Sequence, residues 1–333
     1  MAILIISYIF ISKMILQVQA LFSRVNFFFY YSDFVFNMHS KYLVQWLFAA
    51  TAASAQNTPG VGGDANISQF GNYYNYWIQT ASGLWDLTRS ARQAVTKTYT
   101  VPCSGSKQSI SIEASRSALV IIDMQNFFLH PGLSPSATGG RDVVNATVNM
   151  IQGFRKAGMK VLWTNWGLDN YDLLTMPPSL LEGFSTDHTS ATTFGTDIGI
   201  VPGTNISAGL KLMRGSWNAQ PYGPLYDLQV EGVASGTDMY FNKNRLSGLW
   251  GAQTPLGLWL QENEITTLFF GGVNSDQCVW GTLLDAHYKG LDVVYVEDIS
   301  ATISPYYAAQ MVKYNADLNG FVSNSTMILP ALV

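Results

Sequence analysis

From residue 117 onward, short apolar runs alternate with segments in which apolar residues recur every three to four positions. The first run, SALVIID at 117–123, is apolar almost throughout, as expected of a strand buried on both faces. This alternation over about 215 residues predicts a parallel sheet with helices on both of its faces. The predicted strands are 117–123, 160–165, 238–242, 266–273, 292–297 and 321–323, and the predicted helices are 140–157, 254–262, 277–289 and 306–318.

Two stretches lack this alternation. Residues 166–236 carry many glycines and prolines with little periodicity, so we expect a long loop that covers a site. Residues 56–115 are rich in Gly, Asn, Ser and aromatics, with a weak helical period over 82–97. We expect an N-terminal arm that packs on the domain through its aromatics, with a carbohydrate-binding patch as the alternative. These aromatics are Tyr73, Tyr74, Tyr76, Trp77 and Trp85.

The first 37 residues form an apolar segment that is interrupted by Lys13 and Arg24. Residues 2–22 are about long enough to span a membrane, with Lys13 near the middle. One interpretation of residues 1–37 is therefore a membrane anchor. The other is an upstream extension of the chain ahead of a second start at Met38.

From Met38 the chain has the pattern of a secretory signal peptide. A short basic start precedes the apolar run 42–53, and Ala53-Ser54-Ala55 has the small-x-small form of a signal-peptidase site. We therefore expect a signal peptide over 38–55, cleavage before Gln56, and a secreted protein. Four N-x-S/T sequons fit an N-glycosylated secreted chain, at Asn66, Asn145, Asn205 and Asn324.

Composition excludes several classes of protein. Of the 333 residues, 48% are hydrophobic and 12% charged, which excludes a disordered or coiled-coil chain. The net charge of −4 offers no basic surface for nucleic acid. Two cysteines cannot build a disulfide framework or a Cys-rich zinc site, and the four histidines show no metal-ligand spacing.

Three residues able to carry chemistry fall at the ends of predicted strands. Asp123 ends the first strand, Lys243 follows the third, and Cys278 lies where a helix begins after the fourth. Ligands bind at the carboxyl edge of such sheets, so we expect this carboxylate, ammonium and thiol to meet there.

The three groups together suggest an activated thiol. A helix amino terminus and Lys243 would lower the pKa of Cys278, and Asp123 could accept its proton and return it to a leaving amine. Backbone N–H groups of the turn before the helix could hold an oxyanion. For each residue taken alone, a purely structural role stays open: Cys278 as a core residue, Lys243 as a solvated side chain and Asp123 as the cap of a turn.

The motifs LVIIDMQNFF, KNRLSGLW and GGVNSDQCVWGTLLDAHYKG, in this order and at these separations, resemble the isochorismatase-like cysteine hydrolases. The resemblance covers about residues 117–329 and identifies 116–333 as the hydrolase domain. It implies a three-layer α/β/α sandwich with a six-stranded, mostly parallel sheet. It also implies a catalytic triad of Asp123, Lys243 and Cys278.

The resemblance further implies a cis peptide bond between Val273 and Asn274, just ahead of the nucleophile. The backbone N–H groups of Asn274 and Cys278 would then form the oxyanion hole. This chain has Asn274 where relatives commonly have alanine. That difference concerns the side chains that line the pocket rather than the backbone geometry.

Departures from the family pattern narrow the activity. Nicotinamidases carry an Asp-x-His metal cluster after the second strand, whereas this chain has WTNWGLDNYD without histidine, so we expect no metal and no cofactor. Isochorismatases proper lack the nucleophilic cysteine, so Cys278 indicates hydrolysis of a C–N bond in a small amide or ureide. The alternatives are an isochorismatase-type hydrolase of a chorismate-derived metabolite and a catalytically silent secreted binding protein. Relatives often associate, which allows a homo-oligomer.

Five further residues near the strand ends are candidates for substrate binding. Gln125 could orient substrate or water, and four aromatics could line an apolar pocket. These are Phe128, Trp163, Trp166 and Trp250. Cys103 precedes the hydrolase domain, and a Cys103–Cys278 disulfide would abolish catalysis in a secreted protein.

Overall fold

The computed structural model describes residues 68–333, and its centre is a six-stranded sheet with the strand order β11-β10-β9-β6-β7-β8. Every neighbouring pair in this sheet is parallel, which confirms the predicted sheet. The strands are β6 (Ser117–Ile122), β7 (Lys160–Trp166), β8 (Asp238–Lys243), β9 (Thr267–Val273), β10 (Asp292–Ala301) and β11 (Phe321–Ser323).

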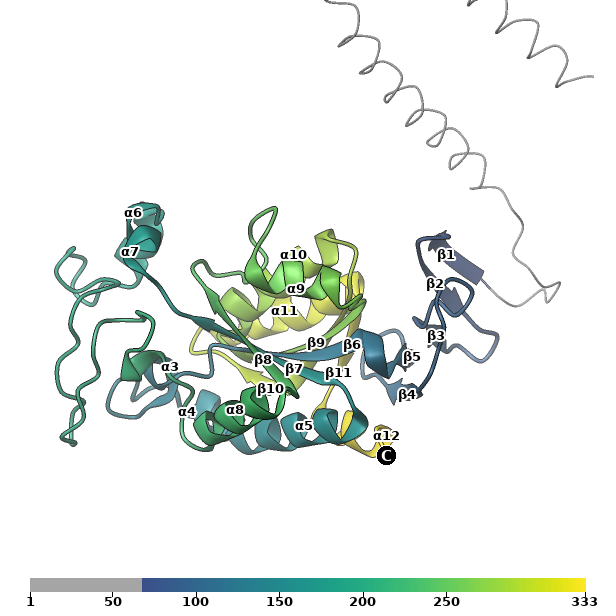
Figure 1. Ribbon diagram of the computed structural model, residues 1–333, viewed down its shortest axis with the longest axis horizontal. Coiled ribbons are helices and arrows are strands. Elements are labelled where there is room, and N and C mark those ends of the chain that lie inside the picture. The colour runs from purple at the N-terminus through teal and green to yellow at the C-terminus, as the bar shows by residue number, and fades with distance from the viewer. Residues whose placement is uncertain (1–67) are drawn as a thin grey trace, which may run out of the picture. The chain divides into compact units, whose positions relative to one another are not determined.

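Helices cover both faces of this sheet, as Figure 1 shows. One face carries α5 (Val144–Ala157), α8 (Pro224–Ser235) and α12 (Ser325–Ala331), and the other carries α9 (Pro255–Glu262), α10 (Trp280–Tyr288) and α11 (Tyr306–Asn319). The predicted three-layer α/β/α sandwich is therefore confirmed.

Each face of the sheet has its own apolar core, because every residue of β6 is buried and successive side chains point to opposite faces. Leu119 and Ile121 belong to the core under α5, together with Phe154. Val120 and Ile122 belong to the core under α9 and α10. The uninterrupted apolar run in the sequence reflects this burial on two sides.

The segment before the sandwich forms a second sheet, with the strand order β1-β2-β3-β5-β4, rather than an arm with a helix. The helix that the period over 82–97 indicated is wrong, since this stretch contains the short β3 and irregular chain. The strands are β1 (Ser68–Asn72), β2 (Asn75–Gln79), β3 (Trp85–Asp86), β4 (Thr98–Pro102) and β5 (Ser109–Glu113), and the 3₁₀ turn η2 (Ala114–Arg116) leads into β6.

A buried ion pair holds this N-terminal sheet to the sandwich. Arg89 Nη1 and Nη2 lie 2.7 Å from the two carboxylate oxygens of Asp292, the first residue of β10. Trp77 donates its indole N–H to the same carboxylate at 2.6 Å and packs on Phe321. The tertiary contacts of Arg89 with Asp292 outweigh the weak helical preference of residues 82–97, so no helix forms there. Of the predicted packing aromatics, Tyr73 and Tyr74 are instead exposed.

The stretch 166–236 contains more helix than its pattern indicated. It includes α6 (Asn170–Leu174), α7 (Pro178–Gly183), the 3₁₀ turn η3 (Trp217–Ala219) and the whole of α8. Helix α8 buries only Leu225 and Gly232, so its sequence lacks the strong apolar stripe from which a helix is predicted. The predicted helix 140–157 is divided into α4 (Thr138–Asp142) and α5, and α12 was not predicted.

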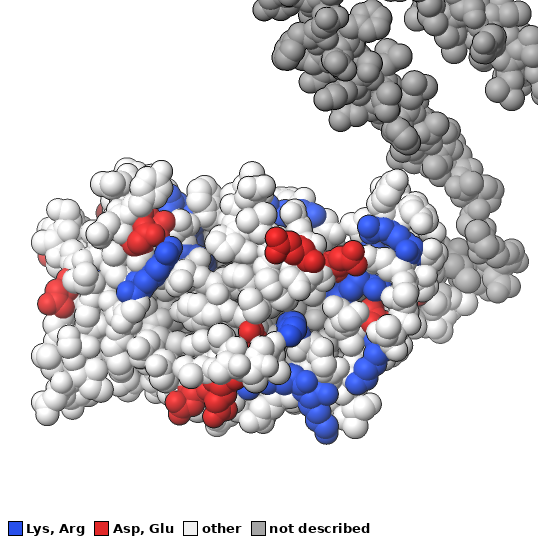
Figure 2. All heavy atoms as spheres, viewed as in Figure 1, with Lys and Arg blue, Asp and Glu red and all other residues white. Residues whose placement is uncertain are grey.

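The proposed signal peptide, membrane anchor and first sequon all lie outside the described residues. Within residues 68–333, none of the helices combines the length and the apolar content that a membrane span requires. On the face that Figure 2 shows, Lys and Arg side chains are interspersed with Asp and Glu rather than gathered in one basic stripe.

Candidate active site

The sheet brings Asp123, Lys243 and Cys278 together at its carboxyl edge. Asp123 follows β6, Lys243 ends β8, and Cys278 lies in the π-helical turn η4 (Ser275–Val279) that follows β9. Lys243 Nζ lies 2.9 Å from Asp123 Oδ2 and 3.5 Å from Cys278 Sγ. A single ammonium thus contacts both the carboxylate and the thiol.

The backbone at this edge is arranged around Asp123. Its φ of +52° lies in the left-handed region that few non-glycine residues adopt, and such residues cluster at functional sites. Its N–H donates to Asn165 Oδ1 at 3.0 Å, while Oδ1 accepts the N–H of Trp166 at 3.0 Å. On the neighbouring strand, Gly272 has φ +130°, and a Cβ there would lie 2.0 Å from Ile122 O. Only glycine allows this close approach.

All three groups are almost completely removed from solvent: Asp123 is 0%, Cys278 3% and Lys243 4% exposed. Burial raises the pKa of the Cys278 thiol to about 12, although the charge of Lys243 opposes the shift. Burial also raises the pKa of Asp123, again opposed by Lys243. The expected lowered pKa of Cys278 is therefore wrong for the free protein, because desolvation outweighs the ammonium.

These two pKa shifts bear on where the thiol proton of Cys278 can move within the site. With Asp123 charged and Cys278 neutral, the carboxylate and Lys243 form a compensated buried pair. Moving the thiol proton to Asp123 creates a thiolate beside the same ammonium and leaves the net charge of the site unchanged. A carboxylate with a raised pKa is a stronger base, so burial favours this transfer over loss of the proton to water.

The turn that carries the thiol has the backbone form that the resemblance implied, since the Val273–Asn274 peptide bond is cis. The carbonyl of Asn274 accepts hydrogen bonds from the N–H groups of Gln277 and Val279, which fixes the turn around Cys278. Phe128 and Asn274 line a small cavity of about 40 Å³ beside this turn. The helix α3 (Asn126–Leu129) carries Phe128 to this place.

Three of the predicted substrate-binding residues occupy other positions. Gln125 is fully buried and uses its amide in bonds to the protein, donating to Trp166 O and Ala219 O and accepting from Trp166 N. Trp163 packs in the core under α5, on the face of the sheet away from Cys278. Trp250 is 52% exposed and donates its indole N–H to Asn244.

Trp166, by contrast, lies within the site. The ammonium of Lys243 stands 3.9 Å from the centroid of its ring. The same ring system also contacts Phe184 and Phe194, whose own rings are stacked at 4.2 Å. The long segment after β7 therefore packs two aromatic side chains against the ring that contacts Lys243.

Sequence reasoning missed two residues around the triad, Asn165 and Asn244. Asn165, which holds the N–H of Asp123, also ends a predicted strand, so the rule that selected Asp123 could have found it. Asn244 donates to Asp172 Oδ1 at 2.6 Å and so ties the residue after Lys243 to α6. This second contact joins segments about 70 residues apart, and no local pattern indicates it.

The two cysteines are free, and they belong to the cores on opposite faces of the sheet. The alternative of a Cys103–Cys278 disulfide is therefore contradicted. Burial raises the pKa of Cys103 to about 12, with Asp317 acting in the same direction.

Cys103 makes the folded protein sensitive to alkaline pH. The unfolded thiol loses its proton near pH 9 while the folded one keeps it, so stability falls as pH rises between about 9 and 12. From pH 9 to 10.5 the wild type should lose about 1.5 kcal/mol more unfolding free energy than Cys103→Ala. Urea unfolding at pH 7, 9 and 10.5 measures this, with pH 7 giving the packing cost of the substitution. Equal losses in both proteins above pH 9 would contradict the assignment.

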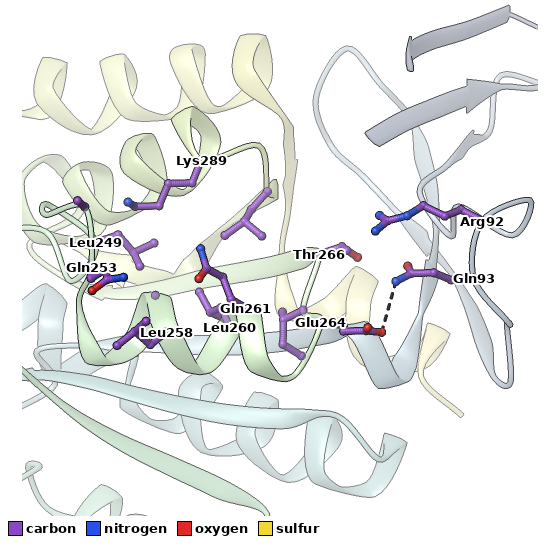
Figure 3. Close-up of a pocket in the computed structure, with 14 residues that line it drawn as sticks. Arg92, Gln93, Leu249, Gln253, Leu258, Leu260, Gln261, Glu264, Thr266 and Lys289 are labelled. Atoms are coloured by element: carbon purple, nitrogen blue, oxygen red, sulfur yellow. Dashed lines mark hydrogen bonds between the residues drawn. The ribbon is translucent and has the colours of Figure 1, made fainter. Parts of the chain in front are cut away.

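A cavity of about 310 Å³ lies elsewhere. Figure 3 shows it along α9, between Lys289 at one end and Arg92 at the other, with Gln93 donating a hydrogen bond to Glu264. Thr266 and Leu291, which precede β9 and β10, also line it. Asp123, Lys243 and Cys278 do not line it, so this cavity is separate from their cluster at the carboxyl edge.

Comparison with known proteins places the chain in a family. The isochorismatase domain model matches residues 117–326. Among solved structures, a cysteine hydrolase from Pseudomonas syringae is similar with a TM-score of 0.50 and 15% identity, covering 66% of this chain and 93% of that one. A nicotinamidase from Bacillus subtilis matches with a TM-score of 0.47 and 22% identity, covering 63% and 99%. An N-carbamoylsarcosine amidase from Thermoplasma acidophilum matches with 0.40 and 22%, covering 64% and 98%. The match to the domain model spans more than half of the chain, and the protein belongs to the isochorismatase family of hydrolases.

Proposed function

We propose that the protein hydrolyses a C–N bond of a small amide or ureide through a thioester on Cys278. The observation that carries this proposal is the buried cluster in which Lys243 Nζ lies 2.9 Å from Asp123 and 3.5 Å from a free thiol. Such a cluster supplies a nucleophile, a base and a fixed cation in one water-poor place, which is what covalent hydrolysis requires.

In the first half of the reaction, Cys278 Sγ attacks the substrate carbonyl carbon while its proton passes to Asp123. The backbone N–H groups of Asn274 and Cys278 stabilise the oxyanion of the tetrahedral intermediate, as the resemblance implies. Asp123 then gives the proton to the substrate nitrogen, the C–N bond breaks, and ammonia or an amine leaves. Lys243 remains an ammonium and balances first the carboxylate and then the thiolate.

In the second half, Asp123 takes a proton from water as its oxygen attacks the thioester carbon. The C–S bond breaks, the proton on Asp123 returns to sulfur, and the carboxylic or carbamic acid leaves. The sum is amide plus water giving acid plus amine, with every group of the triad restored. No step needs a metal or an organic cofactor.

The surrounding charges favour an uncharged amide over a chorismate-derived dicarboxylate. Four cations lie in the segments that flank the triad, and each is already held by main-chain carbonyls. They are Arg141, Lys211, Arg214 and Arg245. Lys243 itself is paired with Asp123. A dicarboxylate would have to displace these contacts, whereas a neutral amide would not.

The test is a panel of nicotinamide, pyrazinamide, N-carbamoylsarcosine, ureidoacrylate and biuret, with ammonia measured by a coupled assay. We expect ammonia from at least one member and none from Cys278→Ala. Acid quenching during turnover should trap an acyl group on the peptide that contains Cys278. Mass spectrometry detects this adduct directly.

Two results would overturn the proposal. The first is cleavage of isochorismate, with release of pyruvate, by both the wild type and Cys278→Ala, which would indicate the isochorismatase-type reaction. The second is a Cys278 thiol that neither acylates nor reacts with iodoacetamide up to pH 11, which would indicate a silent binding protein.

We also propose that the mature protein is secreted and begins at Gln56, on the sequence pattern of residues 38–55 and the four sequons. N-terminal sequencing of protein recovered from culture medium, after expression of the full chain in a eukaryotic host, tests both. A mature chain that begins at Met1 and remains with the cell would overturn this proposal.

Of the sequons at Asn205 and Asn324, we expect the glycan at Asn205. Asn205 is exposed in a turn, whereas the Asn324 side chain caps α12 by accepting from the N–H of Met327 at 3.0 Å. A glycan on Asn324 would have to break this cap, which costs roughly 1 kcal/mol. Glycopeptide mapping, with Asn205→Gln as the control that should remove the modification, measures the outcome. Full occupancy at Asn324 with none at Asn205 would contradict it.

A further inference from the structure

The position of Trp166 links it to all three members of the triad. It ends β7 directly beside the site, and its backbone N–H donates to Asp123 Oδ1 at 3.0 Å. Its ring faces the ammonium of Lys243 at 3.9 Å, a distance at which a desolvated cation is attracted to an indole. The side chain is 0% exposed, so water does not compete for either contact.

The indole N–H of Trp166 is a buried donor without an acceptor. Nε1 makes no hydrogen bond to any atom of residues 68–333. Burying a donor without a partner is unfavourable, and structures rarely keep one without a reason. Trp163 on the same strand shows the ordinary arrangement, since its Nε1–H donates to Asp238 Oδ2 at 2.8 Å.

The sulfur of Cys278 is the candidate acceptor for the indole N–H of Trp166. Lys243 Nζ contacts both groups, 3.9 Å from the Trp166 ring centroid and 3.5 Å from Sγ. A neutral thiol is a weak acceptor, whereas a thiolate is a strong one. A hydrogen-bonding effect of the Trp166 side chain also lowers the pKa of Cys278, against the larger opposing effect of burial.

We propose that Trp166 is a catalytic residue whose indole N–H donates a hydrogen bond to the Cys278 sulfur when it becomes a thiolate, while its ring holds Lys243 in place. This inference rests on the proposed function. It adds the indole N–H to Lys243 and the helix amino terminus as groups that stabilise the Cys278 thiolate. The donor remains unpaired in the thiol state, so the hydrogen bond is gained only as the proton leaves sulfur. Interactions that strengthen along the reaction are those that accelerate it.

The test compares Trp166→Phe with Trp163→Phe. Both substitutions remove one indole N–H from β7 and keep an aromatic ring, but only the first faces the thiol. We measure site-resolved alkylation of Cys278 by iodoacetamide from pH 7 to 11. Trp166→Phe should slow the reaction at every pH in this range, by about tenfold at pH 8, because less of the thiol is then present as thiolate. Trp163→Phe should leave the profile unchanged.

A second variant distinguishes loss of the N–H from an effect of misfolding. Incorporation of 3-benzothienylalanine at position 166 keeps the ring shape and replaces only the N–H, and it should slow alkylation to the same degree. With a hydrolysed amide from the panel, both changes at 166 should lower kcat with little change in KM.

The outcomes separate this inference from the proposed function. Alkylation profiles at 166 that match the wild type, in folded protein that hydrolyses an amide, overturn the role of Trp166 alone. A wild-type Cys278 that is unreactive up to pH 11 overturns both. Slowed alkylation in both the Trp166 and the Trp163 variants would point to a general packing effect and would also overturn the inference.

Discussion

Replacing Asp123 by asparagine is expected to lower amide hydrolysis by about 10²–10⁴-fold, the usual contribution of a positioned acid–base group. Asparagine has the same shape and can still accept the N–H of Trp166, but it cannot take the thiol proton. The change also leaves Lys243 as a buried charge without its partner, and breaking such a pair costs about 3–5 kcal/mol. Both effects are measurable, by ammonia release and by urea unfolding.

A double variant separates these two effects. Asp123→Asn with Lys243→Met removes both charges, so we expect much of the lost stability to return while activity stays absent. Asp238→Asn is the matched control, because Asp238 is also fully buried and paired, with Arg155 at 2.5 Å, but lies away from the thiol. It should destabilise the protein and leave kcat nearly unchanged. An active double variant would show that Asp123 is not the base.

The sheet and the meeting of Asp123, Lys243 and Cys278 could be predicted because each depends on a local signal. Strand β6 is buried on both faces and therefore has an unbroken apolar run from Ala118 to Ile122, which the polar Asp123 follows. The parallel order then places Lys243 and Cys278 at the same edge without further information. The cis bond at Asn274 came from the resemblance alone.

The pKa of Cys278 could not be predicted, since its sign depends on desolvation by residues far apart in sequence. Lys243 acts in the direction that the sequence indicated, but the aromatic segment after β7 and the core under α9 exclude water from the thiol. The position of Trp163 away from the thiol has a simpler reason. Trp163 and Trp166 are three residues apart on one strand, so they point to opposite faces, and only one of them can reach the site.

The sheet β1–β5 escaped prediction because its strands are short and mostly exposed on one face or both. Strand β1 buries no residue, and β3 has only two residues. The contact that fixes this sheet joins Arg89 to Asp292, about 200 residues later in the chain. Neither residue belongs to a local pattern that indicates pairing.

Replacing Arg89 by methionine is expected to destabilise the protein by about 3–5 kcal/mol, because it leaves Asp292 buried without a compensating charge. Asp292 would keep its bonds from Trp77 and Thr267, but both donors are neutral. Urea unfolding gives the loss, and hydrogen exchange should show faster exchange in β2 and β3. Arg214→Met is the control, because the Arg214 guanidinium is half-exposed and its ion pairs should contribute at most about 1 kcal/mol.

The same variant also decides what the N-terminal sheet contributes to activity. Asp292 is the first residue of β10, whereas the triad follows the last residues of β6, β8 and β9, so parallel strands place the two at opposite edges of the sheet. Folded Arg89→Met protein should therefore retain the kcat of the wild type below its unfolding transition. A large loss of kcat in folded protein would show that this sheet supports the active site through the strands. Unchanged kcat with lowered stability would establish it as a cap that stabilises the amino edge of the sandwich.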